Sequence, residues 1–315
     1  MKIVGAEEIR NSVSWPLLIE AIRAGHRRPR AALGDTLLSS GDRRMLVRSS
    51  WIEGYGPGLK AATIFPDNPR RDPPMPSVQG PVILFDDETG AVSALLDGPE
   101  ITKWKTAADS ALGADLLAAP DVVRLAMVGA GAQAAPLVRA HLSVRPSITS
   151  VTIWNRSAER SRVLAESLAA LPVDISVTDD LEAALRDADI VSSATMTETP
   201  LIRGAWLKPG AHVDLVGAYT PTMREADDEA LKRARIFVDC FETTVEHIGE
   251  LKDPIARGAI SRGDVLADLY DLVAGRNGRR SDTEITIFKN GGGAHLDLMV
   301  AHAIAIAAGG AGAAG

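Results

Sequence analysis

The turn over Val128–Ala134 constrains the fold of this chain more than any other stretch of its sequence. An apolar run that predicts a strand comes before it, and a segment with apolar residues at helical spacing follows it. The turn has the pattern G-x-G-x-x-A. Gly129 permits a tight turn, Gly131 lets a phosphate approach the backbone, and Ala134 lets the helix pack closely on the strand. Together they predict a dinucleotide-binding fold with the pyrophosphate at the helix N-terminus.

The chain after residue 120 repeats the alternation of strand and helix that this turn begins. Such alternation predicts βαβ units and therefore an α/β fold with a doubly wound parallel sheet. The 315 residues are enough for two domains of about 150 residues each. We assign 120–293 to a Rossmann domain and 1–119 to a separate domain, with a helix over 294–308 that could belong to either. The glycine-rich tail, 309–315, is predicted to be flexible.

The first part of the chain mixes helical and strand patterns, which predicts an α+β domain. Glu7–His26 has apolar residues at helical spacing and predicts one amphipathic surface helix. Short β-prone runs over Arg43–Leu96 follow each other in hairpin order, and a proline-rich loop over Pro66–Pro76 interrupts them. Pro99–Ala119 predicts a long helix that ends at Pro120.

Composition and charge argue against several classes of partner. The chain has 34 Lys and Arg against 41 Asp and Glu, and this net charge of −7 argues against a general affinity for nucleic acid. The single cysteine, Cys240, cannot form an internal disulfide and is typical of a reducing compartment. The longest apolar run, Val300–Gly315, is shorter than the roughly 20 residues that span a bilayer. We therefore expect a cytoplasmic protein without a membrane partner, and we expect no metal site because no His/Cys cluster has ligand spacing.

The residues after the second strand of the Rossmann pattern bear on the choice of cofactor. Val151–Trp154 predicts this strand, and Asn155, Arg156 and Ser157 follow it. NAD-dependent enzymes place Asp or Glu here to bind the ribose 2′-hydroxyl, and this sequence has no carboxylate at that point. Arg156 and Ser157, with Arg160 nearby, suit a 2′-phosphate, which favours NADP(H) over NAD(H). The alternative is that Arg156 lies over the adenine or is a solvated surface charge.

Six segments spread along the chain share their sequence with one protein family. They are 58–61 (GLKA), 102–108 (TKWKTAA), 128–134 (VGAGAQA), 212–218 (HVDLVGA), 278–282 (GRRSD) and 288–293 (FKNGGG). In this order they resemble the ornithine cyclodeaminase/μ-crystallin family over nearly the whole chain. The resemblance implies a first domain that binds substrate, forms a homodimer and is completed by the last helix. It also implies an active site between the two domains, and hydride transfer between a nicotinamide and the α-carbon of an amino or imino acid.

The resemblance also implies roles for basic residues. Lys60 matches the family's active-site lysine after a Gly-Leu pair, which implies carboxylate binding or proton donation near the imine. Lys105 stands where many members have an arginine for the substrate carboxylate, and it could act there as a point charge. Arg30 and Arg48 are candidates for a further arginine of the family, with a solvated basic face as the alternative. Gly292, in the glycine-rich stretch that borders the nicotinamide in the family, lets the backbone approach a ligand.

One departure from the family pattern distinguishes between activities. Cyclodeaminases of the family carry an aspartate after the strand that matches 212–216, and this chain has Tyr219 there. A phenol, with an ordinary pKa of about 10, is a poor general base at neutral pH. This disfavours ornithine cyclisation and favours a simple reductase, in which Tyr219 or Thr220 orients the substrate. The alternative is that both residues form a structural turn.

These inferences lead to one preferred function and three alternatives. We expect NADPH-dependent reduction of a cyclic ketimine, from Δ1-pyrroline-2-carboxylate to L-proline, with Δ1-piperideine-2-carboxylate as a related substrate. The alternatives are an ornithine cyclodeaminase, an alanine-type amino-acid dehydrogenase and a non-enzymatic NADPH-dependent binder of small ligands. The expected catalytic residues are Lys60, Lys105, Tyr219 and Thr220, and the expected substrate contacts are Arg30, Arg48, Lys60, Lys105 and Gly292. The expected cofactor contacts are Gly129, Gly131, Ala132, Gln133, Asn155, Arg156, Ser157, Arg160, Thr195, Val216, Gly217 and Lys289.

Overall fold

The computed structural model describes residues 1–309, which form two compact units. Unit 1 comprises residues 1–105 and the chain from Ala294 onward, and unit 2 comprises Thr106–Gly293. The division falls inside helix α3 (Gly98–Leu117), whereas the boundary expected from the sequence, after residue 119, follows the end of this helix. Residues 310–315 of the expected flexible tail lie outside the described residues.

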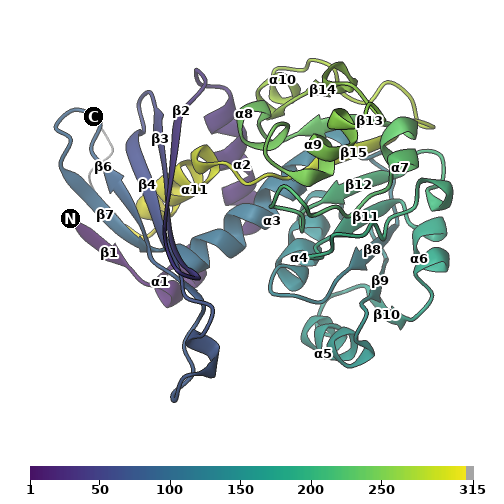
Figure 1. Ribbon diagram of the computed structural model, residues 1–315, viewed down its shortest axis with the longest axis horizontal. Coiled ribbons are helices and arrows are strands. Elements are labelled where there is room, and N and C mark those ends of the chain that lie inside the picture. Colours follow the sequence, from purple (N-terminus) through teal and green to yellow (C-terminus); the bar gives the residue numbers. More distant parts are fainter. Residues whose placement is uncertain (310–315) are drawn as a thin grey trace. The chain divides into compact units, whose positions relative to one another are not determined.

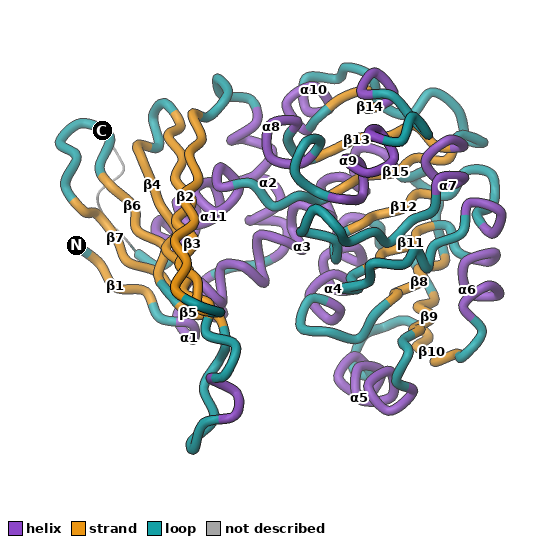
Figure 2. The backbone as a smooth tube through the Cα atoms, in the orientation of Figure 1, coloured by secondary structure: helices purple, strands orange, loops and turns teal. Residues whose placement is uncertain are grey.

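Unit 1 is built on a sheet with the strand order β1-β7-β6-β4-β3-β2, in which β5 pairs with β4 (Figures 1 and 2). Only the pairing of β1 with β7 is parallel among the described strands of this sheet. Helix α11 packs against α2 and against β3, β4 and β6, so the last helix completes the core of this unit. The strands are β1 (Lys2–Val4), β2 (Ala32–Ser40), β3 (Arg43–Ile52), β4 (Gly56–Ile64), β5 (Val78–Gln79), β6 (Pro81–Phe85) and β7 (Val92–Asp97), and the helices are α1 (Ala6–Ser12), α2 (Trp15–His26), a 3-10 turn (Asn68–Arg70) and α11 (Ala294–Ala307).

The first helical segment differs from the sequence prediction. Glu7–His26 was expected to be one helix, but α1 ends at Ser12 and α2 begins at Trp15. Val13 and Ser14 between them have extended backbone angles, and Pro16 lies in the first turn of α2, where its missing N–H costs nothing. The prediction of a single helix was therefore wrong, and strand β2 was not predicted at all.

Unit 2 contains a fully parallel sheet with the order β10-β9-β8-β11-β12-β15-β13-β14. Figure 1 shows α4 on one side of this sheet and α6 and α7 on the other, which is the doubly wound arrangement expected from the sequence. The strands are β8 (Arg124–Val128), β9 (Ser150–Trp154), β10 (Asp174–Thr178), β11 (Ile190–Ser193), β12 (His212–Leu215), β13 (Ala234–Val238), β14 (Val265–Ala267) and β15 (Ile285–Lys289). The helices are α4 (Ala134–Val144), α5 (Ala158–Leu168), α6 (Leu181–Asp187), α7 (Asp228–Arg233), α8 (Phe241–Thr244), α9 (Gly249–Ala256) and α10 (Leu269–Val273), with 3-10 turns at Gly204–Trp206 and Arg262–Asp264.

The strand order of unit 2 creates a switch point between β8 and β11. The chain passes from β8 outward through β9 and β10, and then returns to place β11 on the other side of β8. Ser193 at the end of β11 pairs with Val128 of β8 and with Leu215 of β12, so the loops after these three strands start at one level. Ligands of such sheets bind outside the carboxyl ends of the strands at this point.

The central strands of unit 2 are apolar because helices cover both faces of a doubly wound sheet. Val128, Val191, Val213 and Leu215 are completely buried. Within residues 1–309, no helix combines the length and the apolar sequence that a membrane span requires.

Candidate functional site

The glycine turn after β8 has the geometry of a phosphate-binding turn. Gly129 has a φ of +105°, and a Cβ at this position would lie 2.7 Å from the carbonyl oxygen of Ala194. Its N–H donates to the carbonyl of Trp154 at 2.8 Å. A Cβ on Gly131 would meet nothing within 4 Å, so the space over this residue is open at the N-terminus of α4. The backbone of this turn requires a glycine at position 129, because a side chain there would clash with the neighbouring loop. The open space over Gly131 leaves room for a pyrophosphate at the helix N-terminus, so the turn fits a dinucleotide.

The predicted ribose-binding residues lie in the loop after β9 and at the start of α5. Asn155 Nδ2 donates to the carbonyl of Ser157 at 3.0 Å, which closes the loop on itself. Arg156, Ser157 and Arg160 are exposed. Neither Arg156 nor Arg160 forms an ion pair with another residue in the described part of the chain, so both guanidinium groups are available to an anion.

Two other predicted residues of unit 2, Lys289 and Gly292, lie in the glycine-rich loop or next to it. Lys289 is completely buried, and its ammonium donates to the carbonyls of Leu215 and Asn290 at 2.8 Å each. Gly292 has a φ of +75°, and its N–H donates to a carboxylate oxygen of Asp239 at 2.6 Å. These contacts make Lys289 and Gly292 parts of the framework of the glycine-rich loop.

Tyr219 and Thr220 lie in the loop after β12. Tyr219 is 63% exposed. It stands where a cyclodeaminase of the resembled family would have an aspartate, so this position has no carboxylate. Thr220 accepts a backbone hydrogen bond from Gly249 at 2.9 Å. Nothing here holds the phenol as a general base, since the described residues give it no hydrogen-bond partner.

In unit 1 the structure brings Lys60 against a buried carboxylate. Lys60 lies on β4, its ammonium donates to the hydroxyl of Thr102 on α3, and it lies 3.4 Å from a carboxylate oxygen of Asp297 on α11. The Lys60 side chain is 14% exposed and that of Asp297 is 4% exposed. Three elements far apart in the sequence thus converge on one ammonium group.

Further cations surround the same carboxylate. Arg48 on β3 lies directly opposite Lys60 on β4, and Lys105 is buried on α3. Burial raises the pKa of Asp297, but the charges of Lys105, Lys60 and Arg48 outweigh it and lower this pKa below its ordinary value. Arg48 also forms an ion pair with Asp35 at 3.1 Å, so a second carboxylate contributes to the charge around these cations. A cluster of cations suits an anion such as a substrate carboxylate.

These two sites agree with an independent assignment of the chain to a family. The model of the ornithine cyclodeaminase/mu-crystallin family matches residues 39–308. The chain belongs to this family. The resemblance noted in the sequence is thereby confirmed.

Relatives in the family have known names and structures. The chain is 51% identical over 294 residues to a Δ1-pyrroline-2-carboxylate reductase of Paracoccus denitrificans, covering 93% of this chain and 92% of the relative. Its fold matches the Δ1-pyrroline-2-carboxylate reductase of Thermococcus litoralis in complex with NADH and L-proline, with a TM-score of 0.90, 27% identity and coverage of 98% and 97%. It also matches an archaeal alanine dehydrogenase dimer with bound NAD, with a TM-score of 0.90, 28% identity and coverage of 98% and 96%.

Two buried histidines of this family member, His212 and His295, have a strongly lowered pKa. Burial lowers the pKa of His212 and His295 well below the ordinary value, and neighbouring cationic groups add to the effect. His212 Nδ1 lies 2.9 Å from the hydroxyl of Thr286. No group of three or more potential metal ligands was found among residues 1–309.

Four buried acids organise these sites, and the sequence did not identify any of them as a site residue. Asp239 holds the N–H of Gly292 and the hydroxyl of Thr244, and Asp297 faces Lys60. Glu225 and Glu250 lie in unit 2 and are completely buried. Their sequence signal is weak, because a carboxylate next to an apolar segment is as typical of an exposed loop as of a buried network.

Glu250 gives this family member a testable dependence of stability on pH. Burial, followed by the charge of Glu225, raises the pKa of Glu250 from its ordinary value of 4.5 to about 7. The folded state therefore keeps a proton that the unfolded state releases. This stabilisation is complete below the unfolded pKa and is lost as the pH rises through about 7.

We therefore expect Glu250→Gln to gain stability relative to the wild type as the pH rises from about 5 to about 8. The variant cannot ionise, so its unfolding free energy lacks this pH-dependent loss. Urea unfolding of both proteins across this range measures the difference. The matched control is Glu229→Gln, an exposed residue, for which the difference should not change with pH. A pH-independent difference for Glu250→Gln would contradict the prediction.

Proposed function

We propose that this protein reduces a cyclic ketimine carboxylate, with Δ1-pyrroline-2-carboxylate to L-proline as the leading reaction. The observation that carries the proposal is the cluster of Lys60, Lys105 and Arg48 around one buried carboxylate, in a chain that also has a dinucleotide-binding turn. The 51% identity to a reductase of this name supports the choice of substrate.

The chemistry explains why a cluster of cations is needed. A nicotinamide cofactor, when bound, supplies a hydride to the imine carbon, and a proton must reach the nitrogen to give the amine. The Lys60 ammonium donates this proton or holds the protonated imine's carboxylate, and Thr102 and Asp297 orient it. Lys105 and Arg48 bind the substrate carboxylate, Lys105 as a point charge and Arg48 through its guanidinium group. Arg48 lies opposite Lys60 in the sheet.

The residue at position 219 weighs against ornithine cyclisation. Tyr219 occupies the position of the family's aspartate and is largely exposed, so it offers no carboxylate to activate water or the amine.

An alanine-type dehydrogenase stays a second candidate because a structural relative with this name has the same fold. Its reaction would require free ammonia, whereas the reduction of a preformed cyclic imine would not.

The direct test incubates the purified protein with NADPH and Δ1-pyrroline-2-carboxylate and follows the absorbance of the reduced nicotinamide. We expect oxidation of NADPH with formation of proline in equal amounts and without added ammonia. Ornithine with NAD⁺ serves as the comparison substrate. Conversion of ornithine to proline with release of ammonia, and no oxidation of NADPH by the imine, would overturn the proposal.

We further propose that NADP(H) is preferred over NAD(H), on the support of Arg156 and Ser157 in the loop after β9. We expect kcat/KM to be about tenfold higher with NADPH than with NADH. Arg156→Ala should remove most of this difference by weakening NADPH alone, since NADH lacks the 2′-phosphate. Arg203→Ala, an exposed arginine elsewhere in unit 2, is the control. Equal loss with both cofactors would contradict a role at the phosphate.

We also propose a homodimer and a reducing, cytoplasmic location. Strand β2 is an edge strand with exposed apolar side chains, including Leu37 at 56% and Leu38 at 59%, and such an edge is suited to pairing with a second copy. The dimeric alanine dehydrogenase relative supports the same assembly. Cys240 is free and buried, which is compatible with a reducing compartment.

A further inference from the structure

The carboxylate of Glu225 joins two loops of unit 2. Its Oε1 accepts from the hydroxyl of Ser193 at 2.6 Å, and from the N–H and hydroxyl of Thr195 at 2.8 and 2.9 Å. Its Oε2 accepts from the N–H groups of Gly217 at 2.5 Å and Ala218 at 3.2 Å. Ser193 is the last residue of β11 and Thr195 follows that strand, whereas Gly217 and Ala218 follow β12. One side chain therefore sets the spacing of these two loops.

Both loops lie beside the glycine turn at the switch point of the sheet. A Cβ on Gly217 would collide with the backbone of Thr195, and a Cβ on Gly129 would contact the carbonyl of Ala194. The loop after β11 is therefore packed between the turn after β8 and the loop after β12. Because β11 and β12 follow the first βαβ half of the fold, this side of the crevice receives the second half of a dinucleotide.

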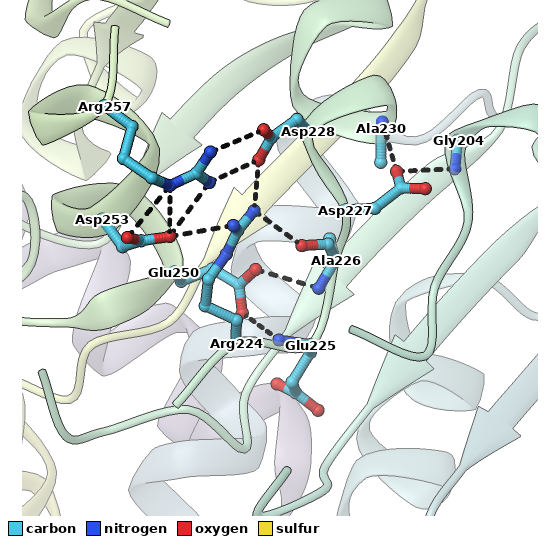
Figure 3. Close-up of polar contacts among 10 residues, drawn as sticks. All are labelled: Gly204, Arg224, Glu225, Ala226, Asp227, Asp228, Ala230, Glu250, Asp253 and Arg257. Carbon is cyan, nitrogen blue, oxygen red and sulfur yellow. Dashed lines mark hydrogen bonds and ion pairs between the residues drawn. The ribbon is translucent and has the colours of Figure 1, made fainter. Parts of the chain in front are cut away.

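Glu225 is itself held in place by a second set of polar contacts. Glu250 accepts from the backbone N–H groups of Glu225 at 2.7 Å and Ala226 at 2.9 Å. The guanidinium of Arg224 donates to Asp253 at 3.0 Å, and Figure 3 shows the Glu225 carboxylate pointing away from this ion-pair cluster. The backbone of Glu225 is thus fixed from one side while its side chain reaches the loops on the other.

The contacts of Glu225 require an ionised carboxylate. Three of its five donors are backbone N–H groups, which cannot reverse their direction. A glutamine in the same place would offer one acceptor oxygen and one NH₂ group, so at least one of these N–H groups would face another donor. The buried ammonium of Lys289 balances the charge, since it opposes the rise in the Glu225 pKa that burial causes.

We propose that Glu225 is a positioning residue, which holds the loops after β11 and β12 in the arrangement that receives the nicotinamide half of the cofactor. The inference rests on the proposed function, because it assumes that a nicotinamide dinucleotide binds at this turn. The adenosine half is expected at Gly131 and at the loop after β9, and the hydrogen bonds of the Glu225 carboxylate go to neither of them. The two halves of the cofactor therefore respond differently to a change at Glu225.

The test compares Glu225→Gln with the wild type in binding two ligands, NADPH and 2′-phospho-ADP-ribose, which lacks the nicotinamide. We expect Kd for NADPH to rise about tenfold or more, as for a lost hydrogen bond to a charged group, while Kd for the fragment stays within about twofold. KM for NADPH should rise in parallel, with a smaller change in KM for the imine. Glu229→Gln, an exposed glutamate in helix α7, is the matched control and should bind both ligands like the wild type.

A second variant keeps the inference testable if Glu225→Gln fails to fold. Ser193→Ala removes one donor to the same carboxylate oxygen and should raise Kd for NADPH about threefold without affecting the fragment. Unchanged NADPH binding, or an equal loss for NADPH and the fragment, would overturn the inference. Failure of the proposed function would look different, since the wild type would then bind NADPH without oxidising it in the presence of Δ1-pyrroline-2-carboxylate, while the two Kd values would still test Glu225.

Discussion

Replacing Lys60 with methionine is expected to lower kcat/KM for the imine at least about 100-fold, the range for loss of a proton donor or a charged clamp. Methionine keeps the apolar stem of the side chain and removes the ammonium that donates to Thr102 and lies 3.4 Å from Asp297. Binding of NADPH should stay within about twofold, because the dinucleotide turn belongs to unit 2. Steady-state kinetics with fluorescence titration of NADPH measure both quantities.

Two further variants of unit 1 show what the Lys60 ammonium does. Lys103→Met is the control, because Lys103 lies on the same helix as Thr102 but is 47% exposed and pairs with Glu100 at 3.1 Å. Lys60→Arg keeps the charge but cannot release a proton. Recovery of activity in Lys60→Arg would identify a carboxylate clamp, whereas continued loss would identify a proton donor. Full activity of Lys60→Met would contradict both roles.

Replacing Gly131 with valine is expected to raise Kd for NADPH about 100-fold, or by about 2.7 kcal/mol. A Cβ on this residue meets no protein atom within 4 Å, so the larger side chain would point into the space proposed for the pyrophosphate. The midpoint of thermal unfolding should stay close to that of the wild type, because the substitution creates no clash in the fold. Calorimetry without and with NADPH measures the two effects separately.

The other glycines supply the controls for this experiment. Gly278 also has open space around its Cβ position, so Gly278→Val should change neither NADPH binding nor stability. Gly129→Ala should destabilise the fold by about 1–3 kcal/mol, since φ is +105° and the new Cβ would lie 2.7 Å from the carbonyl of Ala194. A fall in stability of Gly131→Val as large as that of Gly129→Ala would show that Gly131 serves the fold and not a ligand.

The sequence predicted the parts of this protein that depend on local patterns. The strand–turn–helix around Gly129 and the alternation that follows it specify the doubly wound sheet. Each strand–helix pair carries its own pattern of apolar residues, which can be read locally. The split between α1 and α2 was missed because apolar residues keep their helical spacing across it. The signals for a new helix are only Ser14 at its N-cap and Pro16 in its first turn. Strand β2 was missed because Gly34 and Asp35 break its β-prone pattern, and the strand is stabilised by pairing with β3.

The candidate site was predictable to the extent that its residues lie in recognisable segments. Lys60 and Lys105 could be singled out in this way, and the structure brings both near Asp297. Asp297 and Glu225 were not predicted as site residues, since their importance arises from partners far away in the sequence. Glu225 reaches Ser193 across 32 positions, and Lys60 reaches Asp297 across 237. No local pattern encodes such contacts.

The two parts of unit 1 are translated at different times, because the ribosome synthesises Thr106–Gly293 after the sheet of unit 1 and before helix α11. Unit 2 is one uninterrupted stretch, so all of its strands have been synthesised before α11 is added. Until then β3, β4 and β6 lack the helix that packs against them in the folded protein. The synthesis of unit 2 is therefore complete before unit 1, which carries Lys60, can close its core.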